Sequence, residues 1–315
     1  MPQRFDPDNR QPNDDLRRTT GVLSGFEEPR DNLGFDLLEI YNRNDYGLYT
    51  LTRDIWFALL NQGIRRVGVG NSDTHTLDLV RPGMPRNMVQ VGAEEDSAAA
   101  LTVTTFNRAL AAGKSYATTG PLLSVAARRW DGRLDPDAAA GLGETLTASG
   151  RGRRLESHET ASLGGTLVAP RGKILLDVTV RAAPWVPVDE LRVFLNGEAV
   201  LKVPLATAPP APGSGRRRED RPVMRLHRTF PIHFQEASWL VVEAGPASSV
   251  DPSTPPNPGG DYAIIAPAMY PLAFTNPIFI ETGSGAECDS SDPRGRRVRR
   301  CDSAVRRQRS GSVRR

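Results

Sequence analysis

Histidine and cysteine are scarce in this chain of 315 residues, which has four His and two Cys. No His precedes residue 75, and the two Cys, Cys288 and Cys301, form no Cys-x-x-Cys motif. No Cys/His spacing typical of a zinc finger is present, so a domain built around such a site is excluded. The two Cys could pair in an oxidising compartment, but two Cys do not define the compartment.

Long hydrophobic runs are also absent. No uninterrupted apolar stretch approaches the length that crosses a membrane, and no charged-then-apolar signal segment opens the chain. We therefore expect no transmembrane segment and no signal peptide in this chain. The apolar fraction of 38% is adequate for a packed core, and the length allows two domains of ordinary size.

Lysine occurs only at positions 114, 173 and 202, so almost all positive charge comes from Arg. Ten of the 40 basic residues but only one of the 37 acidic residues lie in 294–315. The rest of the chain carries 30 basic and 36 acidic residues, a net charge of −6. The body of the protein is mildly acidic, and a terminal segment supplies the overall charge of +3.

Three interpretations of the Arg-rich tail over 286–315 stay open. It could bind nucleic acid or an anionic membrane through counterion release. It could be a disordered, solvated tail, or an incorrectly assigned C-terminus, which we favour. No aromatic residue is interleaved with the Arg residues, so base stacking and specific nucleic-acid binding are not indicated.

An α/β pattern begins after a lead-in loop over 1–32. The short apolar run over 34–42 predicts a buried strand in which Leu37, Glu39 and Tyr41 share one face. A helix is predicted over 52–62, because apolar residues recur at helical spacing and Gly63 suits its C-terminus. A second strand is predicted over 64–71. Parallel pairing would bring the carboxyl ends of both strands to one edge.

The α/β part continues with a helix over 97–112 and a strand with a turn over 114–123. The later sequence has the pattern of an all-β module. Further strands are predicted over 173–180, 224–234 and 238–243, with a hairpin over 191–203 that turns at Asn196-Gly197. The predicted units are an α/β part over 33–125, a linker over 126–169 and a β-rich, sandwich-like module over 170–285.

Asp73 and His75 follow the second predicted strand in the run Gly70-Asn-Ser-Asp-Thr-His75. On an extended chain, residues two apart point to the same side, and an oxygen and a nitrogen ligand together suit a hydrolytic divalent metal. The simpler interpretation is a turn in which Asp73 caps backbone amides. His158, His227 and His233 are most simply surface or strand residues.

Several motifs, in this order, resemble the C-terminal half of the PHP (polymerase and histidinol phosphatase) superfamily, in particular its carbaryl-hydrolase branch. Phe35-Asp-Leu-Leu-Glu-Ile-Tyr-Asn42 resembles the penultimate barrel strand, and Asp73-Thr-His75 resembles the last metal motif, Asp-x-His. Shorter matches follow at Pro85-Arg86, Ala111 to Tyr116 and Thr119-Gly-Pro121. The β-rich part resembles the extension of large secreted members, which favours a periplasmic or secreted location.

The resemblance implies an α/β fold, a partial PHP-type distorted β/α barrel followed by the all-β module. It also implies that Asp73 and His75 are the last two ligands of a cluster of divalent ions (Zn, Mn or Fe). The earlier His ligands of that family have no counterpart here, so the cluster is incomplete. The chain could be a fragment, which we favour, could share its barrel with a separate chain, or could be a degenerate homologue.

The implied activity is metal-assisted hydrolysis of a small ester-type substrate, either a phosphoester or a carbamate or other ester. Glu39 is the candidate catalytic residue, which would orient His75 or accept a proton from water. Arg86 is the candidate substrate-binding residue, which would pair with an anionic group. The chain alone would then be inactive or weakly active.

A non-catalytic function is the alternative. The β-rich module contains Trp185 and Trp239, aromatic side chains that could bind a glycan or a partner protein. In that case the α/β part would be inert.

Overall fold

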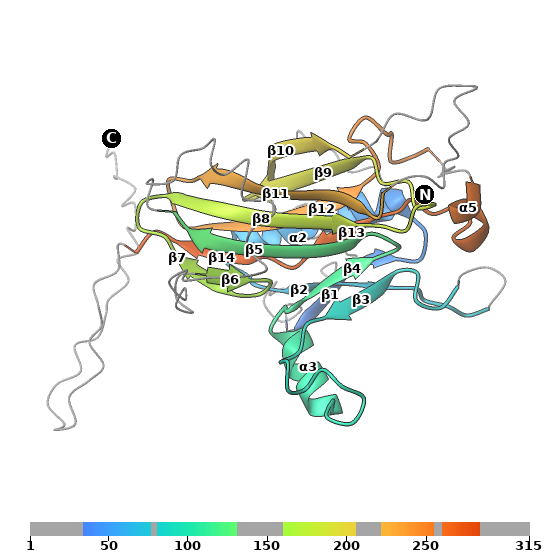
Figure 1. The fold of residues 1–315 in the computed structure, drawn as a ribbon, viewed down its shortest axis with the longest axis horizontal. Helices are drawn as coiled ribbons and strands as arrows, with labels where there is room; N and C mark the ends of the chain where they lie inside the picture. The colour runs from blue at the N-terminus through green and yellow to red at the C-terminus, as the bar shows by residue number, and fades with distance from the viewer. Residues whose placement is uncertain (1–33, 77–80, 131–159, 206–221, 255–259, 284–315) are drawn as a thin grey trace, which may run out of the picture. The chain divides into compact units, whose positions relative to one another are not determined.

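The computed structural model describes residues 34–76, 81–130, 160–205, 222–254 and 260–283. Strands make up 41% and helices 15% of this part (Figure 1). The helices are α2 (Tyr46–Asn61), α3 (Val103–Ala111) and α5 (Gly260–Ile265). The strands are β1 (Leu37–Asn42), β2 (Val67–Asn71), β3 (Arg86–Val89), β4 (Ser115–Thr118), β5 (Leu122–Arg129), β6 (Thr160–Ser162), β7 (Thr166–Val168), β8 (Lys173–Arg181), β9 (Glu190–Leu195), β10 (Glu198–Pro204), β11 (Met224–His233), β12 (Ser238–Gly245), β13 (Ala273–Thr275) and β14 (Ile278–Glu281).

Two of the three sheets pack face to face. The eight-stranded sheet has the order β10-β9-β12-β13-β4-β3, with β14 on β12 and β7 on β14. The four-stranded sheet has the order β11-β8-β5-β6. Alternate residues of β5, namely Leu123, Val125 and Ala127, are buried and join one large core cluster with residues of both sheets. The two sheets therefore form a sandwich held together by apolar side chains.

The third sheet contains only β1 and β2, which pair in parallel and are connected by α2. Asp45 caps α2, because its Oδ1 accepts a hydrogen bond from the Leu48 amide at 2.8 Å. The helix lies against the eight-stranded sheet, where the Phe57 ring is 4.9 Å from that of Trp239. Trp56 is fully buried and donates from Nε1 to the Arg66 carbonyl at 2.8 Å, which ties the helix to the start of β2.

A buried ionic cluster also joins α2 to the eight-stranded sheet. The Glu243 carboxylate on β12 is fully buried and accepts hydrogen bonds from Arg192 on β9. Its other oxygen accepts from the Tyr49 hydroxyl at 2.5 Å and from Arg53 Nη1 at 3.3 Å, both on α2. Because each carboxylate oxygen has partners of its own, the cost of burying this charge is offset.

Two asparagine side chains occupy the second edge of β2. Asn276 Oδ1 accepts from the Gly68 amide at 2.7 Å, and Asn276 Nδ2 donates to the Gly68 carbonyl at 3.0 Å. Asn87 does the same at Gly70, with two bonds of 2.9 Å. Each amide thus replaces one peptide group of a neighbouring strand. Both positions favour Gly, because a Cβ on Gly70 would lie 2.9 Å from that of Ala117, and a Cβ on Gly68 would lie 3.0 Å from the side chains of Ile40 and Trp56.

The prediction of an α/β fold with a partial PHP-type barrel is wrong. Among the described residues strand predominates over helix, and the strands close no barrel. Only β1 and β2 pair in parallel within the predicted α/β part, and Asn87 and Asn276 occupy the edge of β2 where a further strand would continue. The strands that follow, β3, β4 and β5, pair antiparallel with other strands of the sandwich.

Most individual elements lie where the residue patterns predict them. The strand, helix and strand predicted over 34–42, 52–62 and 64–71 correspond to β1, α2 and β2, although α2 begins at Tyr46. The hairpin turning at Asn196-Gly197 is formed by β9 and β10, and both turn residues have positive φ. The predicted lead-in, the Arg-rich tail, His158 and both Cys lie outside the described residues, as does most of the predicted linker.

Candidate functional site

Asp73 and His75 lie just after β2 and are in direct contact. His75 Nε2 is 3.0 Å from Asp73 Oδ1, and the other carboxylate oxygen accepts from Arg43 Nε at 2.7 Å. Arg43 follows β1, and its backbone amide donates to the carbonyl of Asn71 at 3.1 Å. The three side chains therefore meet at the carboxyl end of the two parallel strands.

Turn geometry, rather than strand alternation, brings these side chains together. β2 ends at Asn71, and Asp73 has a φ of 47°, in the left-handed region that Asp tolerates better than most residues. Arg43 has a φ of 54° after β1. Asp73 and His75 therefore do not lie as neighbours on one extended chain, as expected. They meet within the segment after β2, and Arg43 reaches Asp73 from the turn after β1.

The site is open to solvent and carries a polarised carboxylate. The hydrogen bond from Arg43 lowers the pKa of Asp73, and the positive charge of Arg43 and the contact with His75 act in the same direction. The side chain of His75 is 71% exposed and that of Asp73 36%. Asp73 is therefore ionised at neutral pH and accessible to a cation from solution.

The spacing of the pair is compatible with a shared metal ion. Two ligand atoms, each about 2.0–2.1 Å from a tetrahedral zinc, lie about 3.3 Å apart, close to the 3.0 Å that separates His75 Nε2 from Asp73 Oδ1. Arg43 competes for the second oxygen of the same carboxylate. Among the described residues, no group of three or more His, Cys, Asp or Glu side chains could hold a metal.

Glu39, the candidate catalytic residue, is exposed on β1 and accepts a hydrogen bond from Asn42 Nδ2 at 2.8 Å. The predicted common face of Glu39 and Tyr41 is not formed. The pairing register of β1 shifts between these two residues, which turns Tyr41 into the core at 1% exposure. Glu39 lies on β1, the strand that Arg43 follows. Its hydrogen bond is with Asn42 of the same strand, not with Asp73 or His75.

Arg86, the candidate substrate-binding residue, is the first residue of β3 and is partly buried. Its Nη1 donates to the Gly83 carbonyl at 3.1 Å, which closes the loop before β3. Burial raises the pKa of the Tyr262 hydroxyl, and its hydrogen bond to Thr119 and the positive charge of Arg86 offset this rise only in part. A role in substrate binding stays a prediction.

The residue patterns did not indicate Arg43, Asn87 or Asn276. Arg43 follows the first predicted strand directly, so a search for charged residues at strand ends would have found it. The two Asn lie in other parts of the sequence and carry no local signal for pairing with Gly. Of the remaining His, the ring of His233 lies 5.8 Å from that of Trp130, and His227 is exposed on β11.

The comparisons with known proteins identify no relative. No protein-family model, no curated protein and no solved structure matches the chain. In the part of the chain that the structure describes, no helix has both the length and the apolar character needed to cross a membrane.

Proposed function

We propose that Asp73 and His75 are two ligands of a divalent metal centre (Zn, Mn or Fe) in a hydrolase of phosphoesters, carbamates or other esters. The observation that carries this proposal is the contact between a carboxylate and an imidazole at the carboxyl end of two parallel strands. Active sites of open α/β sheets occur at this edge. The motifs that resemble the PHP superfamily favour the same chemistry.

Two protein ligands are fewer than the three or four that zinc sites normally use, so we expect the pair alone to hold the ion weakly. The resemblance to the PHP superfamily suggests the roles of the side chains. A bound divalent ion lowers the pKa of a coordinated water to about 7 and polarises the scissile group. Asp73 and His75 hold the ion, and Glu39 orients His75 or accepts a proton from water. Arg86 pairs with an anionic group of the substrate. On its own, the chain binds the ion weakly and has little or no activity.

Cobalt binding tests the proposal, because Co²⁺ in a His/carboxylate site has a visible absorption band. The full chain, stripped of metal by dialysis against a chelator, is titrated with Co²⁺ and then with Zn²⁺ in competition. We expect weak binding, with less than one equivalent retained after dialysis. His75→Gln and Asp73→Asn should each weaken binding about tenfold or more.

His227→Gln is the matched control, because it removes another exposed imidazole, on β11. It should leave Co²⁺ binding unchanged. Equal affinity in the parent chain and in His75→Gln would show that the ion binds elsewhere, and the proposal would be abandoned.

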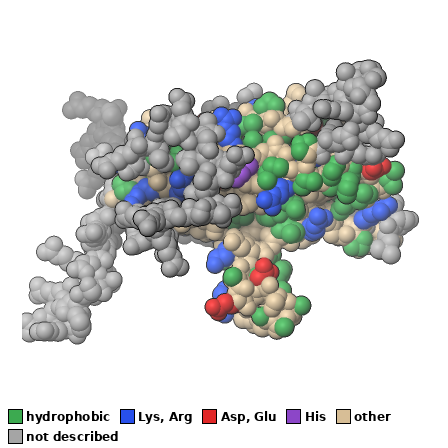
Figure 2. Space-filling model, in the orientation of Figure 1, with side chains coloured by type: hydrophobic (Ala, Val, Ile, Leu, Met, Phe, Trp, Pro, Cys, Tyr) green, Lys and Arg blue, Asp and Glu red, His purple; other side chains and the backbone are tan. Residues whose placement is uncertain are grey.

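A second candidate, non-catalytic binding by the sandwich, is favoured by one exposed aromatic side chain. Trp185 is 43% exposed, whereas Trp239 is 4% exposed, packs on Phe57 and donates to Asn61 Oδ1. Leu122 and Met224 are also exposed and flank Arg181 on neighbouring strands. Figure 2 shows hydrophobic side chains gathered at one end of the face it presents. We propose Trp185, and not Trp239, as the residue that would bind a glycan or a partner protein.

Substitution of Trp185 separates this candidate from the metal centre. Trp185→Ala should abolish retention on an immobilised glycan array or on a captured partner, while Co²⁺ binding stays unchanged. Retention that Trp185→Ala does not affect would remove the candidate.

A further inference from the structure

A pocket opens between the two sheets of the sandwich, on the side where β3 and β6 are the outermost strands. It has a volume of about 380 Å³, and its lining residues belong to β3, β4, β5 and β6 or directly adjoin them. β3 is the edge strand of the eight-stranded sheet, and β6 is that of the four-stranded sheet. β6 has three residues and pairs only with 126–128 of β5, so no described strand covers the earlier part of β5 on this side. The short edge strand therefore leaves the space between the sheets open here.

The inner wall of the pocket is apolar. Leu123 and Val125 of β5, and Leu163 just after β6, are each 6% exposed and belong to the core of the sandwich. Tyr116 of β4 packs against the same core, and its hydroxyl forms a hydrogen bond with the backbone of Leu123 in the other sheet. Met88 of β3 pairs directly with Tyr116, so its side chain lies on the same face, where it is 38% exposed. An apolar group in the pocket would thus contact side chains of both sheets.

One positive charge lies at the rim of this apolar wall. Lys114 extends the ladder of β4 by one residue, because its carbonyl accepts a hydrogen bond from the Gln90 amide at 2.7 Å. Lys114 is two residues before Tyr116, and Gln90 is two residues after Met88. All four side chains therefore lie on the face of the sheet that lines the pocket.

The charge of Lys114 is not neutralised within the described part of the chain. Lys114 is exposed, and none of the described residues forms an ion pair with its ammonium group. None of the described residues that line the pocket is acidic. The side-chain amide of Gln90 adds a neutral hydrogen-bond donor beside it. One cation next to an apolar cavity suits a ligand with a single negative charge and an apolar body.

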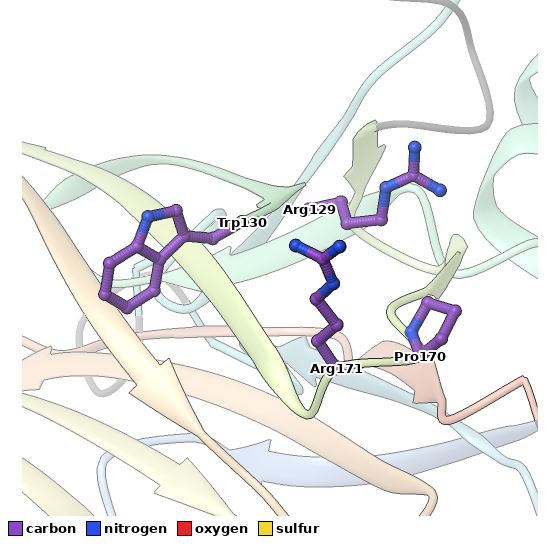
Figure 3. A pocket seen from close by; sticks show the side chains of 4 residues that line it. All are labelled: Arg129, Trp130, Pro170 and Arg171. Carbon is purple, nitrogen blue, oxygen red and sulfur yellow. The ribbon is translucent and has the colours of Figure 1, made fainter. Parts of the chain in front are cut away.

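A second pocket, of about 250 Å³, provides a comparison. It lies where β5 ends and is lined by Arg129, Trp130, Pro170 and Arg171 (Figure 3). Arg129 and Arg171 each have another interaction within the chain. This pocket therefore shows no unmatched positive charge, in contrast to the one beside Lys114.

We propose that the pocket beside Lys114 binds a small amphipathic carboxylate, such as a medium-chain fatty acid. The carboxylate pairs with the Lys114 ammonium group and accepts a hydrogen bond from the Gln90 amide. The apolar chain lies between the two sheets, against Met88 and Leu163. The volume falls within the range of about 300–1,000 Å³ that is typical of small-molecule sites. The site shares no residue with the proposed metal centre and does not depend on it.

Calorimetric titration of the full chain with octanoate, butanoate, octanol and octylammonium tests the proposal. We expect octanoate to bind most tightly. Octanol lacks the negative charge and octylammonium is repelled by Lys114, so both should bind several-fold more weakly. Butanoate should be weaker than octanoate by up to about fourfold for each CH₂ group that the pocket no longer buries. Absence of octanoate binding, or binding of octanol as tight as that of octanoate, would overturn the proposal.

Variants of the lining residues assign the two parts of the ligand. Lys114→Gln should weaken octanoate binding several-fold and leave octanol binding unchanged, because it removes only the charge. Lys114→Glu should make the chain prefer octylammonium to octanoate. Met88→Gln makes the wall polar at similar side-chain length and should weaken both octanoate and octanol. Unchanged octanoate affinity in Lys114→Gln would overturn the proposal.

Two matched controls each remove one positive charge elsewhere. Lys202→Gln changes β10, the opposite edge strand of the eight-stranded sheet, where Lys202 Nζ donates to Ser248 Oγ at 3.2 Å. Arg171→Gln changes the second pocket. Both should leave octanoate binding unchanged. Weakening in Lys202→Gln equal to that in Lys114→Gln would reflect net charge alone and overturn the proposal. A loss confined to Arg171→Gln would place the ligand in the second pocket and overturn it as well.

Discussion

The side-chain amide of Asn276 forms a pair of hydrogen bonds with the backbone of Gly68, 208 residues earlier in the chain. Asn276 is fully buried, and its Nδ2 also donates to the carbonyl of Ser115 at 3.1 Å. One side chain thus connects β2, the start of β4 and the segment between β13 and β14. This connection fixes the β1–α2–β2 unit on the sandwich.

Asn276→Ala should destabilise the protein by about 2–4 kcal/mol. The substitution leaves the amide and carbonyl of Gly68 buried without partners, and each unpaired group costs about 1–3 kcal/mol. Urea unfolding followed by tryptophan fluorescence measures the change. Asn87→Ala is the comparison, because Asn87 makes the same pair of bonds at Gly70 in a partly exposed position, where water replaces the amide. A loss in Asn276→Ala no larger than that in Asn87→Ala would contradict the structural role of Asn276.

Gly70→Ala should also destabilise the protein, by about 1–3 kcal/mol, because the added methyl group has no room. Its Cβ would lie 2.9 Å from the Cβ of Ala117 and 3.3 Å from that of Pro85. Gly34→Ala is the matched control, since a Cβ there meets no atom within 4 Å. Thermal unfolding of both variants measures the effect. A melting temperature of Gly70→Ala equal to that of Gly34→Ala would show that β2 does not pack as closely as the structure has it.

Local patterns predicted the elements that depend on local physics. Ile55 and Leu59, one helical turn apart, form the buried stripe of α2, and Asn196-Gly197 provides the positive φ values that the tight hairpin requires. These signals depend on residues within one turn of each other, so they can be recognised without knowledge of the rest of the fold.

The relations between distant segments could not be predicted in the same way. Asn276 carries no local sign that it substitutes for a strand beside Gly68. β12 is buried along its whole length because α2 covers one face and the four-stranded sheet the other, and alternation of side chains does not report this. Asp73 and His75 were expected to point the same way on an extended chain, whereas positive φ values at Asp73 and Arg43 shape the segments that bring both side chains together with Arg43.

Glu243→Gln should destabilise the protein by about 3–5 kcal/mol, because the neutral amide leaves the charges of Arg192 and Arg53 buried without a counter-ion. Chemical denaturation at neutral pH measures this loss. Glu198→Gln, at an exposed position of β10, is the control and should have little effect. A loss below about 1 kcal/mol in Glu243→Gln would show that solvent reaches the cluster.

The same carboxylate should make stability depend on pH. Burial alone would raise the pKa of Glu243, but Arg192 and Arg53 together bring it below its usual value of 4.5. Because the pKa is lower in the folded state, the stabilisation is complete above about pH 4.5 and is lost as the pH falls through the folded-state pKa. We expect unfolding free energies measured between pH 7 and pH 3 to fall less steeply at acid pH in Glu243→Gln than in the parent chain. Parallel curves for the two proteins would assign the acid sensitivity to other groups.

Arg43→Gln should strengthen Co²⁺ binding several-fold at the Asp73–His75 pair. Arg43 donates to Asp73 Oδ2 at 2.7 Å, so it occupies one carboxylate oxygen and repels an incoming cation. The neutral amide removes the repulsion and frees the oxygen for the metal. The cobalt absorption band at fixed metal concentration measures the effect.

The control for this prediction is Arg65→Gln. It removes the same charge from a residue that precedes the start of β2, at the end of this strand away from Asp73. Arg65 stacks on the ring of Phe279 at 4.0 Å and does not contact Asp73. An equal increase in both variants would reflect net charge alone. A decrease in Arg43→Gln would mean that Arg43 holds Asp73 in the orientation the metal requires, because a residue that only competes for the carboxylate cannot weaken metal binding when it is removed.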